Sequence, residues 1–434
     1  TADNNTGLGY YALQANTTGD LNTAVGALSL DANTTGCCNT SVGSCSLSAN
    51  TTGVKNVAIG RIALRDNTTG DGNVAVGTLS MLANTTGDNN VAIGLCALVT
   101  NSTASNNTAV GKASMLSTTT GTCNTAVGMC SMADNTTGDQ NAAFGYFALQ
   151  NNTTADFNVA IGGCAMFTNT TGCHNTALGR NALYANSTGD NNTAIGCGAL
   201  DTNTTADNNT AVGMNSLQAN TTGSENTALG ISSSYSNTTG SCNVALGRNA
   251  LYTTTTGGQN IAIGTAALYS NTTASNNTAV GSNALLANTT GALNGAFGSS
   301  ALTANTTGGD NNSFGNQSLC SNTTGEFNTA MGQAALSKNT TGSSNTGVGA
   351  NSLVNNTTAT ENVAVGKQAM QATTTGASNT AVGTQSLYTN TTGANNVAMG
   401  LGALFDNTTA SGNTAIGNSA GSDVTTGIEN VFVG

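Results

Sequence analysis

The sequence predicts an all-β fold, a parallel β-solenoid (β-helix or β-roll) of about 26 coils with 17 residues per coil. The main observation is an exact period, because a glycine recurs every 17 residues from Gly9 to Gly434 (425 residues, or 25 steps) without insertion or deletion. A short strand-like segment, such as residues 22–25, precedes each glycine. The period is too short for a pair of helices, so each repeat forms one coil. We therefore expect residues 1–434 to form one continuous repeat domain.

Positions in the coil are numbered from this glycine, which is position 0. The repeat reads G-x-x-[AS]-[LM]-x-x-N-[TS]-T-[GA]-x-x-N-[TV]-A-[VIL], and Gly at 0, Thr at 9 and Asn at 13 never vary. Stacked identical polar side chains can bond to one another, and an invariant glycine indicates positive φ or close backbone approach. We expect structural ladders from these rows, represented by Asn22, Asn39, Asn56, Thr18, Thr35, Gly26 and Gly43.

The strand segment alternates in size. Position 14 is mostly Thr or Val and position 16 is always apolar, so we expect this face to line the solenoid interior, with Leu or Met at position 4 as a second apolar row. Position 15 is nearly always Ala. A face restricted to small side chains indicates that another backbone approaches, either a second wall of the same coil or another chain. The predicted chain-packing face is represented by Ala24, Ala58, Ala109 and Ala194.

The composition excludes some partners. The formal net charge is −11 and only 6% of residues are charged. Nucleic acid and anionic lipid would not be attracted to such a surface. No apolar run is long enough to span a membrane, so we expect no membrane insertion.

No constellation of catalytic residues emerges from the sequence. The acidic residues are scattered over corner positions, whereas catalytic carboxylates need fixed partners in a cleft. The single histidine, His174, has Cys173 as its neighbour, and two ligands do not make a zinc site. We expect a non-enzymatic protein without cofactor or metal.

The eleven cysteines occupy corner positions without forming a regular row. Cys38 with Cys45, and Cys123 with Cys130, lie at opposite ends of a strand, which is too far for a disulfide within the coil. Disulfides between neighbouring chains are one hypothesis for these four residues, and free thiols or local bonds are the alternative.

The Asn-Thr-Thr corner has two interpretations. It matches the N-glycosylation pattern at positions such as Asn16, Asn33 and Asn135. The alternative is a turn in which the Asn side chain bonds to its own backbone, and we favour it because Thr118 and Thr254 replace this Asn elsewhere.

The threonine rows raise a third function. Stacked threonines on a flat solenoid face can order water, and Thr at position 9 is invariant. Because Asn and Gly flank this row, we expect it to be a corner. The Thr row at position 14 is interrupted by Val, as in Val57 and Val74, which favours a core. An ice-binding solenoid is therefore an alternative and not the main prediction.

Strings such as residues 192–196, Asn-Thr-Ala-Ile-Gly, followed by Ala199 and Leu200, resemble the head repeats of trimeric autotransporter adhesins (YadA-like). They look still more like repeats in bacteriophage tail fibres and other bacterial surface proteins. The resemblance covers the whole chain. It implies an extracellular fibre or adhesin of parallel coils at a cell or virion surface, with a left-handed coil and a trimeric state, and no catalytic residues.

These observations predict a self-associating extracellular filament, fibre or stalk, whose partners are copies of itself in a filament or trimer. The alternative is an adhesin or tail fibre that binds a cell-surface or glycan receptor through corner residues such as Tyr10, Tyr11, Tyr146 and Phe147. Residues 418–434 depart from the repeat, and we expect a transition to a following segment there.

Overall fold

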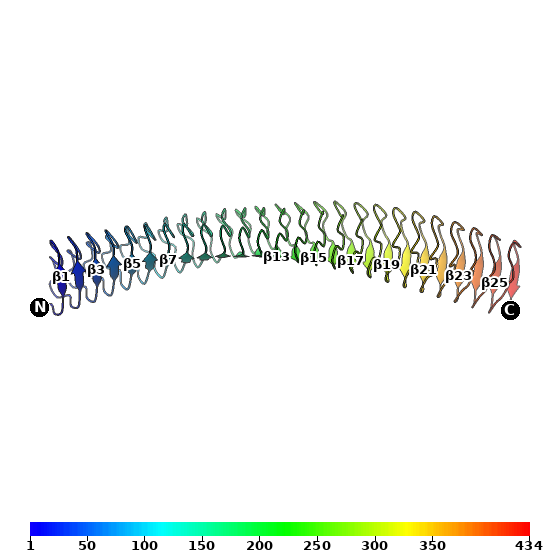
Figure 1. Cartoon of the computed structure of the whole chain (residues 1–434), viewed down its shortest axis with the longest axis horizontal. Helices are drawn as coiled ribbons and strands as arrows, with labels where there is room; N and C mark the ends of the chain where they lie inside the picture. Colours follow the sequence, from blue (N-terminus) through cyan, green and yellow to red (C-terminus); the bar gives the residue numbers. More distant parts are fainter. The chain divides into compact units, whose positions relative to one another are not determined.

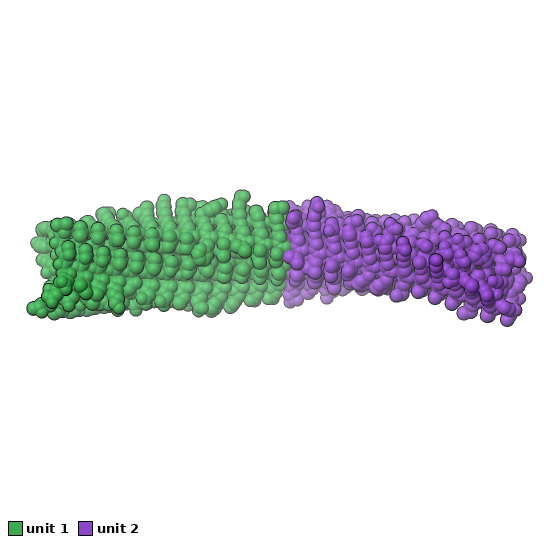
Figure 2. Space-filling view, turned by 60° about the horizontal axis from the view of Figure 1, so that its bottom comes forward, with its two compact units in different colours: residues 1–215 green, residues 216–434 purple.

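The computed structural model describes all residues from 1 to 434, and they form two compact units, residues 1–215 and 216–434 (Figure 2). Both units are all-β parallel solenoids that advance by one three-residue strand per 17-residue coil, as the period predicts. Each unit is described by itself.

In the first unit, consecutive strands pair in parallel, one coil apart, as in Thr6 with Thr23 and Val159 with Thr176 (Figure 1). Its strands are β1 (Thr6–Leu8), β2 (Thr23–Val25), β3 (Thr40–Val42), β4 (Val57–Ile59), β5 (Val74–Val76), β6 (Val91–Ile93), β7 (Thr108–Val110), β8 (Thr125–Val127), β9 (Ala142–Phe144), β10 (Val159–Ile161), β11 (Thr176–Leu178), β12 (Thr193–Ile195) and β13 (Thr210–Val212).

The second unit repeats this pattern, with Thr227 paired to Val244 and Thr414 paired to Val431. Its strands are β14 (Thr227–Leu229), β15 (Val244–Leu246), β16 (Ile261–Ile263), β17 (Thr278–Val280), β18 (Gly295–Phe297), β19 (Asn312–Phe314), β20 (Thr329–Met331), β21 (Thr346–Val348), β22 (Val363–Val365), β23 (Thr380–Val382), β24 (Val397–Met399), β25 (Thr414–Ile416) and β26 (Val431–Val433).

The core of each unit is a narrow column in which the row at position 4 faces the row at position 15. Leu30 and Leu47 at position 4 are fully buried, and so is Ala24 at position 15. At Gly347, a glycine at position 15, an added Cβ would lie 3.4 Å from the side chain of Leu336 at position 4. The two rows therefore pack against each other across the coil.

The prediction that positions 14 and 16 line the interior is wrong. The middle residue of nearly every strand is buried, while its two neighbours are half-buried or exposed, as in Val57, Ala58 and Ile59 of β4. The column is too narrow for two rows of large side chains. Because Leu or Met already fills it from position 4, the strand can send only Ala, Ser or Gly inward, and its larger side chains point outward.

The glycine at position 0 is required for two reasons. Gly26 has a φ of +132°, a backbone conformation that residues with a Cβ rarely adopt. A Cβ on Gly26 would also lie 2.5 Å from the carbonyl oxygen of Gly43 in the next coil. Any larger residue would therefore separate the coils.

The asparagines at position 13 form a buried ladder. The backbone N–H of Asn39 donates to Oδ1 of Asn22 at 3.0 Å, and that of Asn56 donates to Oδ1 of Asn39 at 2.9 Å. The Nδ2 of Asn22 donates to the carbonyl of Gly36 at 2.9 Å. Each asparagine thus satisfies two backbone groups that would otherwise be buried without a partner, which accounts for its invariance.

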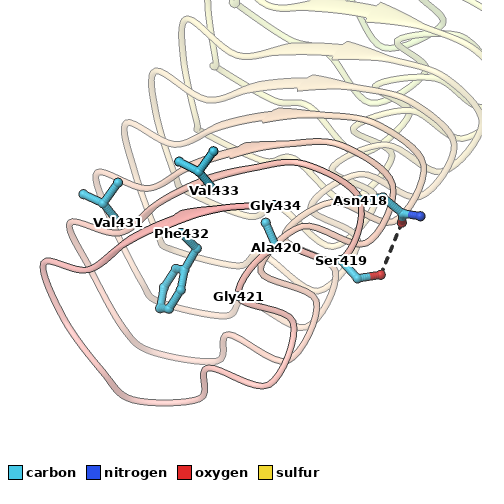
Figure 3. A pocket seen from close by; sticks show the side chains of 8 residues that line it. All are labelled: Asn418, Ser419, Ala420, Gly421, Val431, Phe432, Val433 and Gly434. Atoms are coloured by element: carbon cyan, nitrogen blue, oxygen red, sulfur yellow. Dashed lines mark hydrogen bonds between the residues drawn. The ribbon is translucent and has the colours of Figure 1, made fainter.

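The last coil keeps the architecture with a rearranged core. β26 pairs in register with β25. Gly421 stands where other coils have the core Leu, and a Cβ built on it would meet the ring of Phe432, which occupies the small position 15. In Figure 3 the Phe432 ring projects into the coil while Val431 and Val433 point away from it. A large residue has moved from one wall of the column to the other, so residues 418–434 remain a solenoid coil.

Candidate interaction face

The most distinctive surface of each unit is formed by the outward residues of the strands, at positions 14 and 16, which we call the exposed strand face. Position 16 is apolar in every coil. Its side chains reach water: Ile59 is 41% exposed, Ile93 40% and Phe144 40%. Since the strands pair in register, these side chains form a continuous apolar row along the unit.

The exposed strand face carries no charge. No Asp, Glu, Lys or Arg occurs at position 14 or 16 in any coil. Like side chains stack along it, as in the parallel rings of Phe297 and Phe314, whose centroids are 4.7 Å apart. Large exposed apolar patches in soluble proteins commonly mark interaction sites. This face is therefore the strongest candidate for a binding surface.

The predicted chain-packing alanines do not lie on this face. Ala24, Ala58, Ala109 and Ala194 are each 0% exposed. The neighbour that requires small side chains is the opposite wall of the same coil. These residues cannot contact another chain, and the packing surface has to be sought on the other side of the same strands.

The predicted glycosylation sites face inward as well. Asn33 and Asn135 are fully buried, and Asn16 is half-buried in the first coil. The Nδ2 of Asn33 donates to Oδ1 of Asn16 at 2.8 Å and to the carbonyl of Gly36 at 3.0 Å. A glycan on this nitrogen would replace one of its two hydrogens, so one of the two bonds would be lost, and the sugar would not fit inside the coil. The turn interpretation is the correct one.

The two adjacent threonine rows differ. At position 8, hydroxyls donate to the same position of the next coil, as from Thr34 to the carbonyl of Thr51 at 3.0 Å. At position 9, Thr18 and Thr35 are exposed, and their hydroxyls make no hydrogen bond within the protein. The invariant row at position 9 is thus an outward hydroxyl row, and its side chains do not form a ladder.

All eleven cysteines are free thiols in the structure. Cys38 and Cys123 are exposed, while Cys45 and Cys130 are half-buried. A hydrogen bond with Cys38 raises the pKa of Cys37. Disulfides between chains remain a prediction, and exposure makes Cys38 and Cys123 the more accessible members of the predicted set.

The remaining predicted chemistry is sparse. The ring of His174 stacks on Phe157, with centroids 5.0 Å apart and planes inclined by 18°. No group of three or more His, Cys, Asp or Glu residues is arranged to hold a metal ion.

A recess of about 460 Å³ opens at the last coil and has no titratable side chain in its lining (Figure 3). The structure offers no helical segment that could span a membrane.

The sequence contained a signal for the exposed strand face that the interpretation missed. Side chains at position 16 range in size from Val to Phe, as in Val127 and Phe144, while the residues at core positions 4 and 15 change little. A tightly packed column would require compensating changes elsewhere. Free variation in volume therefore indicates an outward position.

No protein-family model matches the chain, and no curated protein matches it.

Proposed function

We propose that this protein is a non-enzymatic extracellular structural protein that self-associates into a fibre, filament or stalk through its exposed strand face. The observation that carries the proposal is the uninterrupted apolar row at position 16. Leaving such a row in water is unfavourable, by about 25 cal/mol for each Å² of apolar surface that could be buried. The extracellular location rests on the resemblance to surface-fibre repeats.

A second copy of the chain is the partner that fits this face best. Two copies share the same 17-residue period, so an apolar side chain of one coil meets an equivalent side chain of the other along the whole contact. The absence of charge removes the repulsion that identical faces would otherwise experience. A different protein would need a surface with the same repeat.

The experiment introduces three lysines into consecutive coils of the exposed strand face, with Val110, Val127 and Phe144 each replaced by Lys. These positions point to water, so the coil should still fold. We expect sedimentation and electron microscopy to show assemblies for the parent and monomers for the variant, with association weakened by at least about tenfold because a buried unpaired charge is costly.

The control places the same three charges on position 12, with Asn89, Asn106 and Gln140 each replaced by Lys. This position already accepts Lys55. The control should assemble like the parent. A parent that stays monomeric at high concentration, or a control that dissociates equally, would exclude the exposed strand face as the contact.

A second candidate function is ice binding, and one observation favours it. Thr at position 14 points outward beside the apolar row, as in Thr108 and Thr125, so a row of hydroxyl groups runs alongside the apolar row on the exposed strand face. Thermal hysteresis measured on the monomeric lysine variant and on the parent tests this function. Activity in the parent that the variant lacks, at concentrations where neither associates, would favour ice binding.

A further inference from the structure

One side chain interrupts the regular corner surface of the first unit. Tyr146 occupies position 1 and is 50% exposed. Gly163, directly after it in the same row, is the one glycine at position 1 in the whole chain. A Cβ built on Gly163 would overlap Cε1 and Cζ of the Tyr146 ring. The ring therefore lies over the neighbouring coil in space that only glycine leaves open.

Further aromatic residues support this ring. The Phe147 ring meets Tyr146 edge-on, with centroids 5.8 Å apart and planes at 74°. Phe147 packs edge-on against Phe167 at 6.2 Å, and Phe167 stacks on Tyr184 at 5.3 Å. We call Tyr146, Phe147, Phe167 and Tyr184 the aromatic patch. Edge contacts of this kind hold the rings in place.

A free cation lies in the same row. Arg180 occupies position 1 in the coil after Gly163, is exposed, and its guanidinium makes no ion pair or hydrogen bond within the protein. The aromatic patch thus offers the exposed ring of Tyr146, and Arg180 adds an unpaired guanidinium to the same row.

We propose that the aromatic patch and Arg180 form a binding site for an acidic glycan. The electron-rich face of an aromatic ring attracts the polarised C–H groups of a sugar ring. It would also attract a cation, but Arg180 repels one. The guanidinium matches the planar carboxylate of a uronic acid. A sugar with a carboxylate satisfies both groups at once.

The second unit provides a matched control. Tyr252 also lies in an aromatic row, but both of its faces are covered, by Tyr235 at 5.1 Å and by Tyr269 at 5.0 Å. A sugar cannot reach either face of this ring. Tyr252 therefore separates the effect of an accessible aromatic face from the effect of losing any stacked tyrosine.

The experiment measures binding of an oligogalacturonate, and of a neutral galactan oligosaccharide of equal length, by saturation-transfer NMR and tyrosine fluorescence titration. Tyr146→Ala should weaken binding of both sugars by about five- to tenfold. Gly163→Ala should weaken binding of both sugars to a similar extent, because the added methyl group would displace the Tyr146 ring. Alanine occurs at this position in Ala27 and Ala350, so the coil accepts it.

Arg180→Gln should weaken binding of the acidic sugar and leave the neutral sugar unchanged, whereas Tyr252→Ala should change neither. The proposal fails if the parent binds neither sugar or if Tyr146→Ala binds the sugars as tightly as the parent does. It also fails if Tyr252→Ala loses as much affinity for the sugars as Tyr146→Ala. It also fails if Tyr146→Ala weakens self-association and not sugar binding. This inference is independent of the assembly proposed above, since the lysine variants there leave the aromatic patch unchanged.

Discussion

Single residues inside the coil matter chiefly through hydrogen bonds between coils. The asparagines at position 7 form a second buried ladder, in which Nδ2 of Asn101 donates to Oδ1 of Asn84 at 2.7 Å. Thr118 interrupts the ladder at the next coil. As a result, Oδ1 of Asn101 and Oγ1 of Thr118 are both buried without a partner. Unsatisfied buried polar atoms of this kind lower stability.

Thr118→Asn should therefore stabilise the first unit. The new amide can donate to Oδ1 of Asn101, and the position accepts Asn in most coils. We expect the free energy of unfolding to rise by about 1 kcal/mol in chemical denaturation. Asn84→Thr is the matched opposite change, which creates a new interruption and should lower stability by a similar amount. Equal stabilities for parent and both variants would mean that the ladder contributes nothing.

The thiol of Cys242 provides a second test at the scale of the residue. It donates to Oε2 of Glu225 at 3.4 Å, and this hydrogen bond raises the pKa of Cys242. A raised pKa leaves less reactive thiolate at a given pH. Glu225→Gln should therefore speed alkylation of Cys242 at pH 8 by roughly two- to threefold, measured by peptide mass spectrometry.

Cys123 serves as the internal control for this measurement. It is exposed and occupies the same position of its coil, far from Glu225 in the sequence. Its alkylation rate should not change in the variant. An unchanged rate at Cys242 would show that the carboxylate does not hold the proton on the thiol.

The strand is the element on which sequence and structure diverge. The period correctly predicted the coil, the parallel pairing and the register, because only a stacked coil repeats every 17 residues without a gap. It could not predict which side of the strand faces inward. The assumption that apolar residues are buried holds for wide cores, but Leu47 and its equivalents leave room only for alanine opposite.

The corner asparagines show the same limit. Asn33 lies among Thr and Gly, in a pattern typical of an exposed turn, yet its side chain is buried and bonded to Asn16 and Gly36. Gly36 lies in the same turn as Asn33, but only the stacking of one coil on the next provides Asn16 as a partner and buries the side chain. The aromatic patch could likewise be predicted only in part. The sequence indicates Tyr146 and Phe147 as exposed corner residues, but the space that Gly163 leaves for the Tyr146 ring depends on how the two coils stack.

Strand β7 offers a direct test of the inward and outward assignments. Ala109→Leu adds a large side chain to a filled column and should lower the free energy of unfolding by about 1–3 kcal/mol. Val110→Thr, one residue later, changes an outward side chain of similar shape and should change stability by less than about 0.5 kcal/mol. Chemical denaturation of both variants measures the difference. If Val110→Thr lowered stability more than Ala109→Leu, position 16 would have to face the interior and position 15 the solvent.

At the scale of the whole molecule, each coil contacts only its neighbours. The backbone of each coil bonds to the coils directly before and after it, as when the N–H of Met115 donates to the carbonyl of Ser131 at 3.0 Å. Stability in such a solenoid is approximately a sum of equal contributions from coils and from contacts between adjacent coils. One complete coil is thus the unit that can be removed without changing the others.

Deletion of residues 111–127 removes one 17-residue coil and joins Val110 to Gly128, which restores the repeat. We expect the same circular dichroism per residue and an unfolding midpoint lowered by only a few degrees, roughly the share of one coil. Deletion of residues 111–128 removes one residue more and places Met129 where the backbone requires a glycine such as Gly111, whose φ is +134°. This variant should lose cooperative unfolding for two reasons. The backbone at the join has no room for the Cβ of Met129, and the shift by one residue turns the following strand residues to the wrong side of the strand. If both deletions behaved alike, the fold would not depend on coils stacked in register, and the exposed strand face would have no continuous row to present.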